Sequence, residues 1–139
     1  MNRKKTLALC LATCATIFTS IPVYANNYKD SNLPEEYIGY NTYVDTKLRH
    51  KKDDSYHYIY STASVPIRVI SYSPDHDNCT KHGYAVIPAN SKRFIINYVN
   101  ERKYSQCRLS ICTGVSGVTT TLHGKWSPDS IGSYPIANP

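Results

Sequence analysis

The feature that most constrains the fold is an alternating run of residues near the middle of the chain. Residues 56–61 read Tyr-His-Tyr-Ile-Tyr-Ser and follow two aspartates, so Tyr56, Tyr58 and Tyr60 share one face. Aromatic and β-branched residues at period two are typical of a half-buried β-strand. We therefore predict a central strand here, with the three tyrosines on one side and a histidine, an isoleucine and a serine on the other.

The rest of the chain repeats short apolar runs that are separated by Pro, Gly, Asn and Asp. Outside the N-terminal segment, no run of ten or more residues has helical spacing. About six to eight short strands with turn signals between them predict an all-β fold, an antiparallel β-sandwich or a small barrel. We expect a single domain of residues 35–139. Its other strands are expected at residues 36–47, 67–72, 83–88, 91–100, 106–113 and 118–123.

Residues 1–25 have the three regions of a secretory signal peptide. Three basic residues precede an uncharged apolar run, and Val23-Tyr24-Ala25 supplies small residues at the cleavage positions. We expect cleavage after Ala25 and a secreted protein. The polar residues 26–34 would then form a flexible lead-in to the domain.

This N-terminal segment has two alternative interpretations. Residues 6–25 are about long enough for a retained membrane anchor, which takes roughly 20 apolar residues, but Thr, Ser and Pro dilute their second half. A lipoprotein would use Cys14, but Thr13 stands where a smaller residue usually precedes the cysteine. We therefore predict that the mature chain has no membrane span.

Cleavage lowers the formal net charge from +6 to +3, because three of the sixteen basic residues and none of the ten acidic residues lie in residues 1–25. This modest positive charge suits an anionic cell wall or another anionic envelope component better than nucleic acid. The basic residues Lys47, Arg49 and Lys51 lie close together and are candidates for binding an anion. The alternative is that this charge run is a solvated loop.

Three cysteines remain in the mature chain. Cys107 and Cys112 are five residues apart in one expected strand, which at about 3.3 Å per residue exceeds the roughly 4.4–6.8 Å that a disulfide tolerates between Cα atoms. Cys107 shares the apolar face of that strand, whereas Cys112 shares the opposite face with Arg108. A disulfide would therefore join Cys79 to Cys112. A bridge to Cys107 and no bridge at all remain alternatives.

The loop from Asp75 to His82 gathers carboxylate, imidazole and thiol groups within eight positions. A zinc site would need a second pair of ligands, and a calcium loop would need more carboxylates and a placed glycine. We interpret the segment as a surface turn. We predict neither a metal nor another cofactor.

Catalysis is the weaker class of function. A cysteine hydrolase needs a thiolate that is activated by histidine, commonly at a helix N-terminus, and no helix is expected near Cys112 or His82. A glycosidase needs two facing carboxylates, and every acidic residue falls in an expected polar loop or strand end. A secreted hydrolase that uses cysteine and histidine is kept only as a third alternative.

Tyrosine is the most prominent side chain of the mature region, which has all but one of the thirteen tyrosines. Rigid rings with a polar tip can bind sugars or proteins, and Tyr56, Tyr58 and Tyr60 are the best candidates. The segment Trp126-Ser127-Pro128-Asp129-Ser130 is the most distinctive motif. We predict structural roles for Trp126, Pro128 and Asp129, because Pro128 favours a turn and Trp126 suits the core.

Three segments together resemble a known but uncharacterised family. They are Thr46-x-x-Arg49-x-Lys51-x-Asp53, Asn97-Tyr98-Val99-x-Glu101 and Gly124-x-Trp126-Ser127-Pro128-Asp129-Ser130. The chain is similar in them to small secreted proteins of Gram-positive bacteria that contain a domain of unknown function. The resemblance implies an extracellular all-β domain and no mechanism. The overall layout is more weakly similar to the lactococcin-type β-sandwich bacteriocins, which interfere with cell-wall synthesis; this chain differs in its greater length and its cysteines.

These observations lead to two main hypotheses. The first is a small secreted, non-enzymatic protein that acts by binding at or outside the bacterial envelope. The second is a bacteriocin of the lactococcin kind. The sequence does not specify the ligand, the strand order or the oligomeric state.

Overall fold

The computed structural model describes residues 27–139, and the predicted signal peptide with its cleavage site lies outside them. The described region contains strands and no helix, so no helix there could cross a membrane. The eleven strands of residues 27–139 are β1 (Ser31–Asn32), β2 (Tyr37–Ile38), β3 (Val44–Asp45), β4 (Arg49–His50), β5 (His57–Ser61), β6 (Ile67–Tyr72), β7 (Ala85–Ile87), β8 (Ser91–Ile95), β9 (Gln106–Thr113), β10 (Thr120–Thr121) and β11 (Gly124–Ser127).

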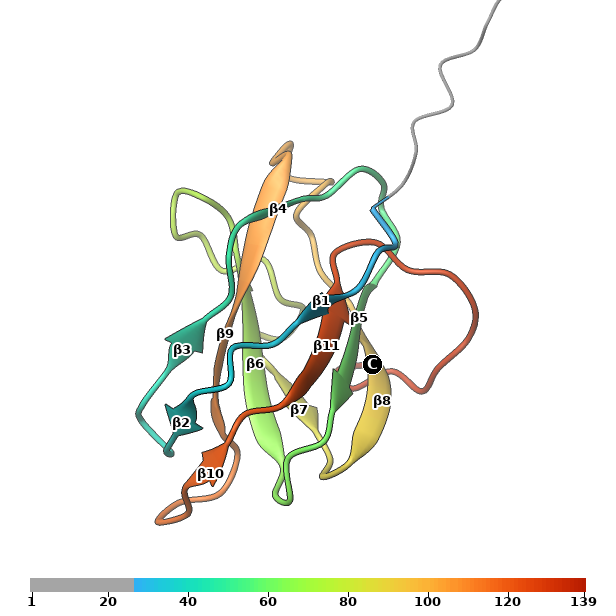
Figure 1. The fold of residues 1–139 in the computed structure, drawn as a ribbon. Coiled ribbons are helices and arrows are strands. Elements are labelled where there is room, and N and C mark those ends of the chain that lie inside the picture. The colour runs from blue at the N-terminus through green and yellow to red at the C-terminus, as the bar shows by residue number, and fades with distance from the viewer. Residues whose placement is uncertain (1–26) are drawn as a thin grey trace, which may run out of the picture.

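The strands form two main antiparallel sheets (Figure 1). One has the order β1-β11-β5-β8. The other has the order β3-β9-β6-β7, with β4 also paired to β9, and a small third sheet pairs β10 with β2. The all-β prediction is confirmed. The expected central strand is also confirmed, because β5 pairs with β11 on one side and with β8 on the other.

The core lies between the inner faces of the two main sheets. In β5, His57, Ile59 and Ser61 are buried while the tyrosines between them are partly exposed. A single apolar cluster joins residues of the first sheet, such as Ile59 and Trp126, to residues of the second, such as Val69 and Leu109. Each fully buried side chain of this size contributes about 1.5–3 kcal/mol. This shared core makes the fold a sandwich.

Two regions differ from the prediction. Residues 26–34 were expected to be a flexible lead-in, but Ser31 and Asn32 pair with Trp126 and Lys125 in β11, and Leu33 is buried. The second region is β11 itself, which the sequence did not predict as a strand. Both strands are short, and backbone pairing stabilises them with little contribution from alternating apolar side chains.

The disulfide prediction is also corrected, since Cys79, Cys107 and Cys112 are all free and buried. Cys79 donates its backbone N–H to Ser71, and Ser71 pairs on its other side with Leu109 in β9. Residues that oppose one another across strands share a face, so Cys79 and Leu109 both point inward. Cys112 lies three residues beyond Leu109 and therefore points to the opposite face.

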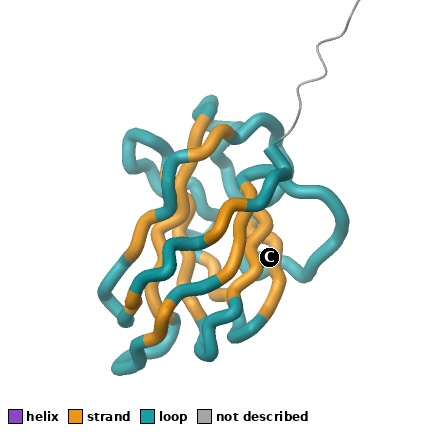
Figure 2. The backbone as a smooth tube through the Cα atoms, in the orientation of Figure 1, coloured by secondary structure: helices purple, strands orange, loops and turns teal. Residues whose placement is uncertain are grey.

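The chain between β11 and the C-terminus positions the candidate site. Figure 2 shows it as a long loop that extends away from the sheets before it returns. Its end runs parallel to β8, where Phe94 donates its N–H to Pro135 and accepts a hydrogen bond from Ala137. The loop therefore covers the edge of the first sheet and lies over its outer face.

Candidate functional site

Asp129 anchors the start of the candidate site from inside the protein. Its carboxylate accepts hydrogen bonds from Lys51 Nζ at 2.8 Å and from the backbone N–H groups of Asn27 at 2.8 Å and Lys52 at 3.1 Å. The side chains of Lys51 and Asp129 have no exposed surface. Burial alone would raise the pKa of Asp129, but these hydrogen bonds outweigh it and the pKa is lowered. The pair therefore ties the N-terminal segment and the loop before β5 to the C-terminal loop.

Arg49 makes a second connection of the same kind. It donates to the carbonyl oxygen of Trp126 at 2.9 Å and to Asn27 Oδ1 at 2.9 Å, and also to the carbonyl of Lys29. Its guanidinium carbon lies 5.3 Å from the centre of the Trp126 ring, and burial lowers the pKa of Arg49. Thus Arg49 and Lys51, two of the predicted anion-binding residues, are committed to internal contacts. The third, Lys47, lines a cleft of about 560 Å³ together with Arg49 and two acidic residues.

His57 links the same motif to the second sheet. Its Nδ1 atom lies 2.8 Å from the carbonyl oxygen of Pro128, and its Nε2 atom lies 2.7 Å from Ser71 Oγ. Burial, reinforced by the charge of Lys51, lowers the pKa of His57 to about 3. Trp126, Pro128 and Asp129, for which structural roles were predicted, are all buried in this network.

The lowered pKa of His57 predicts a loss of stability in acid. The unfolded chain takes up a proton near pH 6.5, whereas the folded chain keeps His57 neutral down to about pH 3. The free energy of unfolding should therefore decrease by about 3 kcal/mol between pH 6.5 and roughly pH 4.5. Asp129 adds to this loss only at lower pH, because a carboxyl group whose folded pKa is lowered loses its stabilising contribution as the pH falls through its unfolded value of 3.8 and below.

Denaturant unfolding at a series of pH values measures this dependence. The matched variant is His57→Gln, which cannot be protonated but can keep a hydrogen bond. This variant should be less stable at neutral pH. Between pH 6.5 and pH 4.5 its free energy of unfolding should depend less steeply on pH, by the contribution of about one bound proton. An identical slope in both proteins would exclude His57 as the source.

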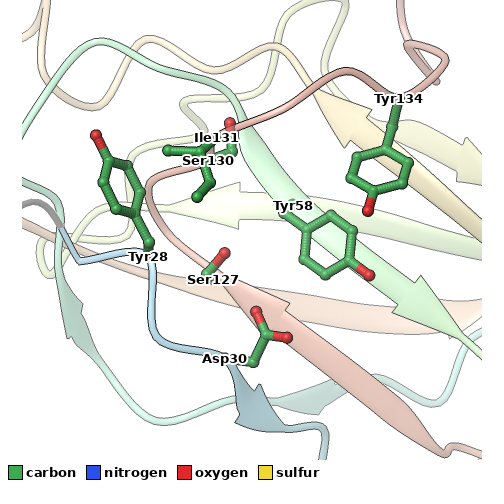
Figure 3. Close-up of a pocket in the computed structure, with 7 residues that line it drawn as sticks. All are labelled: Tyr28, Asp30, Tyr58, Ser127, Ser130, Ile131 and Tyr134. Carbon is green, nitrogen blue, oxygen red and sulfur yellow. The ribbon is translucent and has the colours of Figure 1, made fainter.

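An aromatic hollow of about 320 Å³ lies on the outer face of the first sheet (Figure 3). Tyr58 and Tyr134 lie on one side of it, Tyr28 and Ile131 lie on the opposite side, and Ser127 and Asp30 lie between them in this view. The ring centres of Tyr58 and Tyr134 are 5.1 Å apart. The complete lining is Tyr28, Asp30, Tyr58, Ser127, Ser130, Ile131 and Tyr134. We call this the first hollow.

A second hollow of about 510 Å³ adjoins the first, because Ser130 and Tyr134 line both. Its lining is Asp54, Ser55, Tyr56, Phe94, Ser130, Gly132, Ser133, Tyr134 and Ile136. Phe94 joins the two aromatic groups, since its ring centre lies 5.3 Å from that of Tyr134 and 6.2 Å from that of Tyr56. We call the two hollows together the aromatic groove.

The predicted row of tyrosines is therefore divided. Tyr58 lines the first hollow and Tyr56 lines the second, whereas Tyr60 lines neither. Lys92 Nζ lies 5.2 Å above the ring of Tyr60, and Lys125 is its partner on the other neighbouring strand. The basic residues Lys92 and Lys125 on this face thus lie beside Tyr60, the next tyrosine along β5, and do not line the groove.

The polar groups that line the first hollow are tyrosine and serine hydroxyls and one carboxylate. Burial raises the pKa of the Tyr58 hydroxyl, and the neighbouring Tyr134 and Asp30 add to the shift. The phenol therefore stays neutral and can both donate and accept hydrogen bonds. The groove can hold a flat, polar molecule between rings, hydroxyls and a carboxylate.

No cysteine or histidine of residues 27–139 lines the groove. Burial raises the pKa of Cys107 to about 12. Cys112 is buried beside Arg68, whereas His82 is exposed and bonds the carbonyl oxygen of Pro139. Within residues 27–139, no group of three His, Cys, Asp or Glu side chains is placed to hold a metal ion.

Sequence reasoning identified Tyr56 and Tyr58 but missed the other half of the groove. Tyr28 and Asp30 lie in the expected lead-in, and Tyr134 lies in the C-terminal tail. The available signal was a tyrosine within each of these otherwise polar end segments. Contacts far apart in the sequence bring them together, and the sequence did not reveal those contacts.

Comparison with known proteins gives a family and no function. Residues 21–130 match the model of a family described as proteins of unknown function (DUF2712). No curated protein and no solved structure matches the chain. The match ends at Ser130, the last residue of the motif that contains Trp126 and Asp129, and it includes Tyr56 and Tyr58 of the groove. Since the match covers most of the chain, this protein belongs to the DUF2712 family of proteins of unknown function.

Proposed function

We propose that this protein is a non-enzymatic binding protein that acts at or outside the bacterial envelope and holds a carbohydrate in the aromatic groove. The observation that carries the proposal is the first hollow, in which Tyr58 and Tyr134 present ring faces beside Asp30 and two serines. Export is expected from the signal-peptide pattern of residues 1–25.

The chemistry of the lining suits a sugar. A sugar ring has apolar C–H faces that pack on aromatic rings and a rim of hydroxyls that need hydrogen-bond partners. Tyrosine combines both properties, because its body is apolar and its tip is polar. Ser127, Ser130 and Asp30 supply further donors and acceptors around the same hollow.

Binding is favoured over catalysis by the number and placement of the titratable groups. Each hollow has one aspartate, Asp30 in the first and Asp54 in the second. Glycoside hydrolysis needs two carboxyl groups about 5–10 Å apart on either side of the scissile bond. No cysteine or histidine of residues 27–139 lines either hollow.

The test uses Tyr58→Ala and its matched control, Tyr60→Ala. Both residues lie on the same face of β5 and are partly exposed, but only Tyr58 lines the groove. Sedimentation of the purified proteins with Gram-positive cell walls should show at least a fivefold weaker affinity for Tyr58→Ala, about the loss that defines an energetically important contact. Tyr60→Ala should bind like the unmodified protein.

Two results would contradict the proposal. One is that the unmodified protein stays in the supernatant. The other is that the Tyr58→Ala and Tyr60→Ala proteins bind with equal affinity while both remain folded by circular dichroism. Either result would remove the groove as the binding site.

A further inference from the structure

We propose that the ligand of the aromatic groove is an extended glycan chain that bears free amino groups. This inference rests on the proposed function and specifies its ligand. Two observations carry it: the two hollows adjoin at Ser130 and Tyr134, and each contains a carboxylate without a lysine or arginine in its lining.

The adjacency of the hollows suits a chain of sugars. Ser130 and Tyr134 belong to both linings, so the two spaces lie side by side and an extended ligand can reach from one to the other across these two residues. Tyr56 and Tyr58 are two residues apart on one face of the chain, which corresponds to about 6.6 Å along a strand. This distance is comparable to one sugar unit in a polymer. Adjacent units can therefore lie on adjacent rings.

Contacts between aromatic rings fix the positions of the side chains that line the two hollows. Phe94 packs edge-on against both Tyr56 and Tyr134, and Tyr58 packs against Tyr134. Contacts of this kind restrict ring rotation, which lowers the entropy cost of binding. The C-terminal loop thus contributes Tyr134 as the ring that joins the two hollows.

The charges around the groove indicate that the glycan chain carries amino groups. Asp30 and Asp54 are exposed and take part in no ion pair among the described residues. Neither hollow is lined by a lysine or arginine of residues 27–139. Arg49 interacts electrostatically with Asp30 from outside the lining, and Lys92 and Lys125 flank Tyr60 in the next row.

An acidic groove disfavours a purely anionic ligand. A phosphate or carboxylate polymer would meet the two aspartates, and no lysine or arginine lines either hollow. A protonated amine would instead form a charge-assisted hydrogen bond with each of them. The expectation from net charge alone, an anionic envelope component, therefore does not extend to this groove.

The experiment compares two soluble probes of equal length, oligomers of glucosamine and of N-acetylglucosamine. They differ in the free or acetylated amine on each unit. Isothermal titration of the purified protein, at a pH that keeps the amine protonated, should give at least a tenfold preference for the glucosamine oligomer. Monomeric glucosamine should bind more weakly than the oligomer, because it occupies one hollow.

Three variants assign the preference to residues. Asp30→Asn and Asp54→Asn should each reduce the preference several-fold, and the double variant should abolish it. Asp75→Asn, in an exposed loop that lines neither hollow, is the matched control and should retain it. Each substitution keeps the size of the side chain, so a change reports the charge.

The outcomes separate this inference from the proposed function. Equal binding of both oligomers, or a preference that the double variant retains, overturns the amine inference but leaves the groove as a binding site. If neither oligomer binds while cell walls still bind in a Tyr58-dependent manner, the ligand class is wrong and the function stands. If neither oligomers nor cell walls bind, both proposals fail.

Discussion

Replacement of Asp129 by alanine is expected to lower the free energy of unfolding by about 3–5 kcal/mol. The change leaves the buried ammonium group of Lys51 with only its longer ion pair to Asp53, at 3.5 Å, and it removes the acceptor for the N–H groups of Asn27 and Lys52. Because Asn27, the Lys51-Lys52 pair and Asp129 belong to three segments that are distant in sequence, the packing of these segments should loosen together. Denaturant unfolding of the unmodified protein and of Asp129→Ala measures the loss.

Two further variants test the physical cause. Asp54→Ala removes an exposed carboxylate from the loop that follows Lys51 and should change stability by less than about 0.5 kcal/mol. The double variant Lys51→Met with Asp129→Leu should be more stable than Asp129→Ala, because no charge is then buried alone. A loss below about 1 kcal/mol for Asp129→Ala would show that the pair does not hold the segments together.

Gly124→Ala is expected to be the second strongly destabilising change, with a loss of about 3–5 kcal/mol. Gly124 has a φ of 141°, a conformation that favours glycine, and it pairs with Ser61 at the start of β11. A Cβ atom on this residue would lie 1.9 Å from the carbonyl oxygen of Tyr60. The added methyl would therefore force β11 away from β5 in the middle of the sheet.

The variant Gly117→Ala separates the cost of backbone strain from the cost of a steric clash. Gly117 also has a positive φ, of 71°, but an added Cβ would meet nothing within 4 Å. Its substitution should cost about 1–2 kcal/mol, which is the conformational strain alone. Thermal or denaturant unfolding of both variants provides the comparison. Equal losses would show that the close approach of Gly124 to Tyr60 is not limiting.

The strands that the sequence predicted are those in which burial of one face produces a recognisable pattern of side chains. The alternation of residues 56–61 identified β5, and the expected strands at 67–72 and 106–113 coincide with β6 and β9. In β5 and β6 buried and partly exposed residues alternate strictly, since one face meets the core, and β9 alternates over its first half. Such strands are accessible to pattern reasoning because burial imposes the pattern.

β1 and β11 were missed for the opposite reason. β1 has only Ser31 and Asn32, and its pairing with β11 is a matter of backbone hydrogen bonds. β11 begins at a glycine and contains a single large apolar residue, Trp126. Neither segment is long enough to show a period, so the sequence indicated a lead-in and a turn.

The charged residues of the site were misjudged because their partners are distant in sequence. Arg49 and Lys51 lie in a polar run that is typical of a solvated or anion-binding loop. Lys51 instead pairs with Asp129, which is 78 residues away, and Arg49 bonds the carbonyl of Trp126. Sequence alone does not show which acidic residue a lysine will meet inside a fold. The groove was only partly predicted for the same reason: Tyr58 was a candidate, but its contact with the distant Tyr134 was not expected.

The most direct test of the account is to locate the binding surface by nuclear magnetic resonance. The isotope-labelled protein would be titrated with soluble cell-wall fragments, and the shifted backbone amides would be assigned. The account predicts shifts concentrated at Tyr28, Asp30, Tyr58 and Tyr134, around the aromatic groove. Shifts centred instead on the outer face of the second sheet near Arg68, or no shifts at saturating concentration, would contradict it.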